Sequence, residues 1–253
     1  MNNYPPVSDS PQPAPAPQSV RVALPQSAPY VTYSIIGVTV LIYLVQLATR
    51  LFLQRDIPAE ILEKSNGLIR AGELWRLLTP ALLHGPIMHI AFNMYALLAL
   101  GTGLERYFGR GRFLLLYLLG AFSGNVASFL FTPVPSLGAS TAIFGLLGAQ
   151  GIFLYQNRKL FAGRFRSAIG NIIFIAAINL FIIGSLPGID NWGHIGGLLG
   201  GLIFTSFAGP LWEVEGIQPA YHLVDRRPAR EVIIGAAVVV FIFGGLAMWG
   251  MVQ

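Results

Sequence analysis

Residues 113–157 read FLLLYLLGAFSGNVASFLFTPVPSLGASTAIFGLLGAQGIFLYQN and contain no Asp, Glu, Lys or Arg. A helix needs roughly 20 apolar residues to cross the hydrocarbon core of a bilayer, so this stretch is long enough for two crossings. Its middle part, TPVPSLG at residues 132–138, breaks the run, because proline lacks a backbone donor and glycine permits turns. The stretch therefore predicts two membrane helices joined by a short turn.

Similar uncharged runs lie on both sides of this stretch and are separated by short charged clusters. Together they predict seven spans, which makes the chain an all-α polytopic membrane protein. The predicted spans cover or are centred on residues 34–49, 86–104, the two halves of 113–157, 167–185, 191–208 and 232–251.

The composition excludes an ordinary soluble protein. Of the 253 residues, 54% are hydrophobic and 11% are charged, and the mean hydropathy is +0.64, whereas a soluble domain carries about a quarter charged residues. The formal charge of +5 does not indicate a nucleic-acid partner, because the basic residues lie between apolar runs and not in one stripe with exposed aromatics. The absence of cysteine excludes disulfides and thiol chemistry.

The distribution of Lys and Arg predicts the orientation in the membrane. If the N-terminus lies inside, the inner segments carry eleven of the sixteen Lys and Arg residues, and the outer five all fall between the first two spans. Positive charge is retained on the cytoplasmic side, so the N-terminus is predicted to be cytoplasmic. Residues 1–28, rich in Pro, Ser and Gln, are predicted to be a disordered tail without a transit peptide, which favours a bacterial plasma membrane.

Three predicted spans carry polar side chains at the same depth. Spans two, four and six run from outside to inside, and near their outer ends lie His89 and Asn93, then Ser140, then His194. Polar groups inside a span are costly and usually face the interior of the bundle. These four side chains are therefore the candidates for a buried polar site.

Ser140 and His194 are each open to two interpretations. Ser140 follows Gly138 and Ala139 at the start of a predicted helix. There it is either a nucleophile beside free backbone N–H groups that could bind an oxyanion, or only the cap of the helix. His194 is either the general base that removes the serine proton or an interior histidine bonded to a carbonyl group.

Glycines around these two residues predict close helix packing. Two overlapping G-x-x-x-G spacings follow His194 in span six, and span four has small residues of its own. Such spacings let two membrane helices approach closely, which would bring Ser140 and His194 within hydrogen-bond reach. Taken alone, the glycines indicate packing only. They are Gly196, Gly197, Gly200 and Gly201 in span six, and Gly145 and Gly148 in span four.

His89 and Asn93 are four residues apart and project from one face of span two. They could donate hydrogen bonds to a developing oxyanion, or form interhelical polar contacts. His84 is predicted to be structural, and His222 has no predicted role. A zinc site built from His84, His89 and His194 is the metal alternative, but their spacing matches no familiar zinc motif, so no metal and no cofactor are predicted.

These residues stand in motifs that resemble the rhomboid family of intramembrane serine proteases. The resemblance extends over residues 30–208, which hold six of the predicted spans, and it implies a six-helix rhomboid core plus one C-terminal transmembrane helix (6+1). The motifs are ELWR at residues 73–76, HGPIMHIAFN at 84–93, GTGLERYFG at 101–109, GASTAIFGLLG at 138–148 and DNWGHIGGLLGG at 190–201.

The resemblance implies a role for each residue that matches a motif. Ser140 looks like the nucleophile and His194 like the general base of a dyad without a third carboxylate. His89, Asn93 and the Ser140 backbone N–H look like the oxyanion hole. Phe144 resembles the aromatic residue that packs against the catalytic histidine. The glycines at the supporting positions are Gly138, Gly197 and Gly201.

The implied activity is hydrolysis of peptide bonds in transmembrane protein substrates within the lipid bilayer. The implied domains are residues 29–210 as the protease core, 211–231 as a cytoplasmic linker and 232–253 as the seventh helix. The natural substrate and the oligomeric state do not follow from the sequence. A small-solute transporter is the alternative from another class, but its ion path would normally use acidic residues within the spans, and the midspans have none.

Two residues depart from the family pattern. Thr141 stands where the family's G-x-S-G motif has its second glycine, and Gly193 stands where an alanine usually precedes the histidine. Thr141 places a β-branched side chain next to the nucleophile. The alternative function is therefore a catalytically impaired rhomboid-like protein that binds membrane clients without cutting them.

Overall fold

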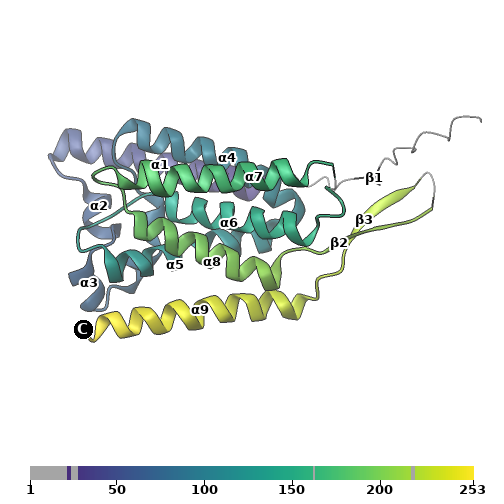
Figure 1. Ribbon diagram of the computed structural model, residues 1–253. Coiled ribbons are helices and arrows are strands. Elements are labelled where there is room, and N and C mark those ends of the chain that lie inside the picture. Colours follow the sequence, from purple (N-terminus) through teal and green to yellow (C-terminus); the bar gives the residue numbers. More distant parts are fainter. Residues whose placement is uncertain (1–21, 24–27, 162, 218–219) are drawn as a thin grey trace, which may run out of the picture.

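The computed structural model describes residues 22–23, 28–161, 163–217 and 220–253. Most of the described chain is helical, and the helices lie side by side in one bundle (Figure 1). This confirms the predicted all-α polytopic architecture. The predicted disordered tail lies outside the described residues, apart from residues 22, 23 and 28.

Long helical segments occur at each predicted span. In the described residues they are α1 (Tyr30–Leu53), α4 (Ile87–Phe108), α5 (Arg110–Phe131), α6 (Ser140–Gln156), α7 (Phe165–Ala177), α8 (Asn191–Ala208) and α9 (Ala229–Met251). A π-helical turn (Ile178–Ile182) and a 3-10 turn (Ile183–Ser185) extend α7. The sequence does not predict this change of helix type.

Five of these segments are long and apolar enough to cross a membrane by themselves, namely α1, α4, α5, α9 and α7 with its extension to Ser185. The other two are α6, which has 17 residues, and α8, whose first turn holds Asn191 and His194. Both pack against α5 in the interior of the bundle. The arrangement is consistent with six core helices plus α9.

The interior of the bundle is built on glycine contacts between α6 and α8. A Cβ on Gly197 would lie 2.0 Å from the Thr141 carbonyl oxygen, and one on Gly201 would lie 2.0 Å from the Gly145 carbonyl oxygen. No side chain fits in these gaps, so the two backbones touch as G-x-x-x-G spacing allows. This contact sets the start of α6 beside the start of α8.

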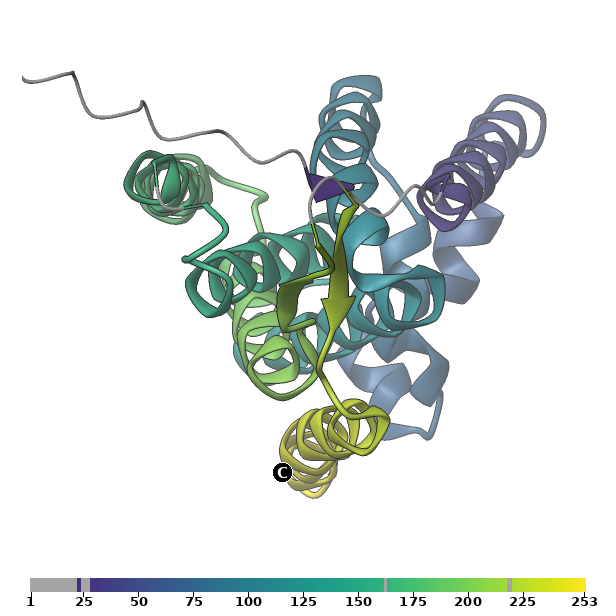
Figure 2. The ribbon, with the colours of Figure 1, turned by 90° about the vertical axis from the view of Figure 1, so that its right-hand side faces the viewer.

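The helices differ in how far they are enclosed. In α5, 72% of the apolar window is buried, whereas in the segment from Phe165 to Ser185 only 6% is buried. Viewed along the bundle, α1, α7 and α9 lie at its periphery (Figure 2). Lipid must therefore cover most of α7, since an apolar helix is stable when it is exposed only to hydrocarbon.

The loop between α1 and α4 folds into short helices at one end of the bundle. They are α2 (Ile57–Leu62), α3 (Asn66–Arg70) and two 3-10 turns, Leu74–Leu77 and Thr79–Leu82. Arg76, from the ELWR motif, is buried and donates to the carbonyl oxygens of Glu60 and Glu63, both at 2.8 Å. A buried guanidinium with several acceptors fixes the fold of this loop.

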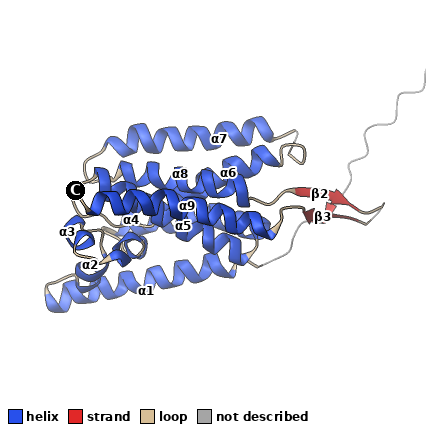
Figure 3. Cartoon of the chain, turned by 90° about the horizontal axis from the view of Figure 1, so that it is seen from below, coloured by secondary structure: helices blue, strands red, loops and turns tan. Residues whose placement is uncertain are grey.

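A small sheet projects from the opposite end of the bundle (Figure 3). Strands β2 (Trp212–Glu215) and β3 (Tyr221–Asp225) form an antiparallel hairpin, and β1 (Val22–Ala23) pairs with β3 in parallel. The sequence analysis predicts only a linker over residues 211–231. The hairpin is missed because its strands have only four and five residues, and a run as short as the alternating Trp212–Glu215 is a weak strand signal.

Candidate active site

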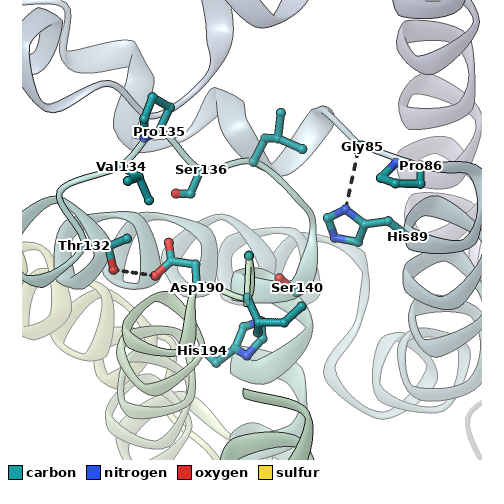
Figure 4. Close-up of a pocket in the computed structure, with 13 residues that line it drawn as sticks. Gly85, Pro86, His89, Thr132, Val134, Pro135, Ser136, Ser140, Asp190 and His194 are labelled. Carbon is teal, nitrogen blue, oxygen red and sulfur yellow. Dashed lines mark hydrogen bonds between the residues drawn. The ribbon is translucent and has the colours of Figure 1, made fainter. Parts of the chain in front are cut away.

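A pocket of about 330 Å³ lies at the end of the bundle opposite the sheet. Three predicted site residues line it, namely His89 from α4, Ser140 from α6 and His194 from α8 (Figure 4). The loop of residues 132–137 and the segment 188–190 complete the wall. The sequence predicts the helices that meet here, but not the loop that encloses the site.

Ser140 is the first residue of α6 and is half-buried at the pocket wall. Ala139 occupies the N-cap position and makes no side-chain capping bond. The Ser140 hydroxyl has no hydrogen bond within the described residues, and neither has its backbone N–H. A free N–H in the first turn of a helix attracts negative charge, so an oxyanion could bind beside the serine oxygen.

His194 is held by stacking. Its ring lies parallel to that of Phe144, with a centroid distance of 4.3 Å and an interplanar angle of 8°. In the described part of the chain Nδ1 is buried without a hydrogen-bond partner, and no bond joins His194 to Ser140. Because Nδ1 is enclosed while the residue lines the pocket, the imidazole meets the pocket through its Nε2 edge.

His89 presents a donor to the pocket. Its Nδ1 accepts a long hydrogen bond of 3.5 Å from the Gly85 N–H (Figure 4), so the proton of the neutral ring sits on Nε2. A Cβ on Gly138 would lie 2.9 Å from this Nε2, and Gly138 has a φ of +136°. Glycine is required at position 138 on both grounds.

Asn93 and His84 stand behind the pocket. Asn93 is buried and its amide donates to the His89 carbonyl oxygen at 3.0 Å; it does not line the pocket. His84 is fully buried, packs edge-on against His89 with centroids 5.1 Å apart, and accepts from the Ala139 N–H at 3.4 Å. Among the described residues, no group of three His, Cys, Asp or Glu side chains is placed to hold a metal ion.

The two departures from the family pattern face each other. A Cβ on Gly193 would lie 3.1 Å from the Thr141 Cγ2 methyl, and one on Gly124 would lie 2.9 Å from the same methyl. The Thr141 side chain is buried, and its hydroxyl has no partner within the described residues. The larger residue at position 141 therefore occupies the space that the smaller residue at position 193 leaves.

Asp190 is a residue of the site that the sequence analysis does not identify. It caps α8 by accepting from the Gly193 N–H at 3.0 Å, and it also accepts from the hydroxyls of Thr132, at 2.8 Å, and Ser128. Burial raises the pKa of Asp190, but these hydrogen bonds outweigh burial and lower it. An Asp before a predicted helix could have indicated the cap, but not the link to α5.

Lys64 fixes the loop that encloses the pocket. Its side chain is fully buried, and Nζ donates to the carbonyl oxygens of Thr132 and Val134, both at 2.7 Å, and to the Asn66 side chain at 3.0 Å. Thr132 ends α5, where the helix dipole is negative, and this offsets part of the cost of burying the cation. Burial lowers the pKa of Lys64 to about 8, while Asp190 and Glu63 oppose the shift.

Comparison with known proteins identifies the domain. A family model described as the Rhomboid domain matches residues 71–210, more than half of the chain. This match includes every predicted site residue.

Several curated proteins share this similarity. The chain is 45% identical over 183 residues to the rhomboid protease GluP of Bacillus subtilis, a match that covers 72% of this chain and 34% of that protein. It is 42% identical over 192 residues to the mitochondrial RHOMBOID-like protein 6 of Arabidopsis thaliana, covering 72% of this chain and 62% of the relative. The match to RHOMBOID-like protein 1 covers 42% of that protein, so the chain spans between a third and two thirds of these relatives.

Proposed function

The chain belongs to the rhomboid family, and from this we propose that it is an intramembrane serine protease that cleaves peptide bonds in transmembrane protein substrates. The residues assigned to the reaction are Ser140 as nucleophile and His194 as general base. The observation that carries the proposal is that Ser140, His194 and His89, from three helices, line one pocket between apolar spans. Polar side chains at membrane depth are costly and are kept for function.

In the proposed reaction, the Ser140 oxygen attacks the carbonyl carbon of the scissile bond, and His194 Nε2 takes the hydroxyl proton. The same proton then passes to the leaving amine as the peptide bond breaks, which leaves an acyl-enzyme on Ser140. A water molecule, deprotonated by His194, hydrolyses the ester and restores the serine. No third carboxylate takes part, and the parallel ring of Phe144 replaces it in orienting the imidazole.

The developing oxyanion would be bound by two donors, the Ser140 backbone N–H and the Nε2–H of His89. Both belong to residues of the pocket wall, and fixed donors of this kind stabilise the transition state strongly. Asn93 would have to leave the His89 carbonyl oxygen, to which it donates at 3.0 Å, before it could contribute. We therefore expect removal of the Asn93 amide to lower the cleavage rate less than removal of the His89 imidazole.

The orientation, the location and the domain bounds expected from the sequence are part of the same proposal. The N-terminus is cytoplasmic in a bacterial plasma membrane, so the pocket opens toward the outer face. Residues 29–210 form the protease core, residues 211–231 form the cytoplasmic connection, and α9 is an accessory helix. The support is the charge distribution, because ten of the fifteen Lys and Arg residues that the structure describes lie on the side of the sheet.

The test is cleavage of a tagged single-span substrate in liposomes by the full chain and by two variants, Ser140→Ala and His194→Ala. We expect the parent to cleave and both variants to lose at least about a thousandfold in rate, as removal of a nucleophile or its base does. Arg55→Gln, an exposed change at a residue that does not line the pocket, is the matched control and keeps the parent rate. Absence of cleavage by the parent across several substrates would favour a client-binding protein instead.

A further inference from the structure

The two ends of the bundle differ in how their cations are compensated. At the pocket end every described cation in the last turn of α1 and in the loop between α1 and α4 has a partner in the chain. Arg50, Arg55 and Arg76 pair with carboxylates, Lys64 binds carbonyl oxygens, and Arg70 lies over the Phe129 ring. Three of these five cations are therefore neutralised by carboxylates of the chain itself.

At the sheet end, the segment from the end of α6 to the first turn of α7 carries cations that have no carboxylate partner among the described residues. Its four basic residues have no carboxylate within ion-pair distance among the described residues, and all are exposed. They are Arg158, Lys159, Arg164 and Arg166. Arg158 also donates to the Tyr155 carbonyl oxygen at 3.2 Å and lies over the Tyr155 ring. Other cations of this end, Arg106, Arg110 and Arg230, likewise have no carboxylate partner among the described residues.

The carboxylates at the sheet end already pair with other groups of the chain. Glu213 and Glu215 pair with Arg226, and Asp225 pairs with Arg112 at 2.9 Å. Glu231 pairs with Arg227, and Glu105 accepts from the first backbone N–H groups of α1. The cations of the connection between α6 and α7 cannot recruit them without breaking these contacts.

Two of the free cations border a cavity. A pocket of about 540 Å³ lies between the end of α6 and the start of β2, and Arg158 and Lys159 line it together with Trp212 and Glu213. The Glu213 carboxylate pairs with Arg226 at 3.4 Å, so it is partly neutralised. Its floor is rigid, because Asn157 is buried and bonds to Pro210 and to the Trp212 N–H at 2.9 and 2.8 Å. A cavity lined by two cations that have no carboxylate partner among the described residues suits a phosphate group.

We propose that this cavity binds the phosphate headgroup of an anionic phospholipid, with Arg158 and Lys159 as its ligands. The location favours a lipid over a soluble anion, since α6 ends at Gln156 and the cavity therefore lies at headgroup level. Tyr155 is 58% exposed beside it and stacks under the Arg158 guanidinium. Tyr and Trp side chains prefer this interfacial depth.

The experiment measures the binding of phosphatidylglycerol to the purified full chain by native mass spectrometry from mixed micelles. The test variant is Arg158→Gln with Lys159→Gln. The matched control, Arg106→Gln with Arg230→Gln, removes the same charge from exposed positions at the same end that do not line the cavity. We expect roughly 30-fold weaker binding in the test variant and less than about twofold change in the control.

Three results would overturn the proposal. Equal weakening in both double variants would show attraction to overall charge and no site. Equal binding of phosphatidylcholine would show that the headgroup charge is not recognised. Displacement of phosphatidylglycerol by glycerol phosphate at the same concentration would show a site for soluble phosphates. Unchanged thermal midpoints of both variants in detergent would establish that they are folded, and the readout does not depend on proteolysis.

Discussion

At the residue scale, the proposed mechanism gives Phe144 the task that a hydrogen-bonded carboxylate has in a catalytic triad, which is to orient the histidine ring. In the described chain the His194 Nδ1 has no acceptor, and the ring is oriented by stacking at 4.3 Å. Phe144→Leu keeps an apolar group but removes the flat face, so we expect kcat/KM to fall about fivefold, since an aromatic pair contributes about 1 kcal/mol. Phe144→Tyr keeps the face and should stay within about threefold in the same cleavage assay. Equal rates for the Leu variant and the parent would contradict the role of stacking.

Thr141 and Gly193 are expected to be energetically coupled, because a Cβ at position 193 would lie 3.1 Å from the Thr141 methyl. Gly193→Ala alone should lower stability by about 1 kcal/mol through overpacking. In the Thr141→Ala background the same change should cost less, since the methyl is gone, which a double-mutant cycle of unfolding free energies detects. Additive effects would mean that the two departures are independent.

At this scale the sequence predicts some residues of the site and misses others. Ser140, His89 and His194 can be found because each is polar in an apolar span. Asp190 and Lys64 cannot, because their partners in the loop of residues 132–137 are distant along the chain and leave no periodic signal. The Phe144 contact follows from helix spacing only once the position of α8 is known.

At the scale of the elements, the contact between α6 and α8 leaves no room for an added methyl group. Gly201→Ala would place a Cβ 2.0 Å from the Gly145 carbonyl oxygen, which forces the helices apart at backbone level. We expect a loss of about 3 kcal/mol or more, measured as a large drop in the thermal midpoint together with loss of cleavage. Gly244→Ala in α9, where a Cβ would meet nothing within 4 Å, is the matched control and should be neutral. A neutral Gly201→Ala would contradict the packing.

Hydropathy along the sequence is enough to predict the long helices, but not the irregular elements. Long apolar windows predict the helices, and α8 spans Asn191–Ala208 as its window does. The π-turn after α7 is not predicted, because the Leu180 carbonyl oxygen accepts from the Asn191 side chain at 3.0 Å, a tertiary contact. The pairing of β1 with β3, from opposite ends of the chain, leaves no local pattern either.

For the whole molecule, Lys64 makes the free energy of unfolding depend on pH in the alkaline range. Its folded pKa of about 8 lies below the ordinary value of 10.5, so folding disfavours the protonated form. The free-energy cost of burying the protonated lysine is greatest below pH 8 and disappears as the pH rises to about 10.5. The thermal midpoint of the parent should therefore rise over this range relative to Lys64→Met. A constant difference between the two proteins would contradict the burial of a charged lysine.

The central claim is that Ser140 is a nucleophile activated by His194 inside the membrane-spanning bundle. Covalent labelling by a fluorophosphonate probe, with the modified residue located by peptide mass spectrometry, tests it most directly, because the probe needs an activated serine but no substrate. The account predicts one label on Ser140 in the parent, none in Ser140→Ala and at least about a hundredfold slower labelling in His194→Ala. A label on another serine, or an unchanged rate in His194→Ala, would contradict it.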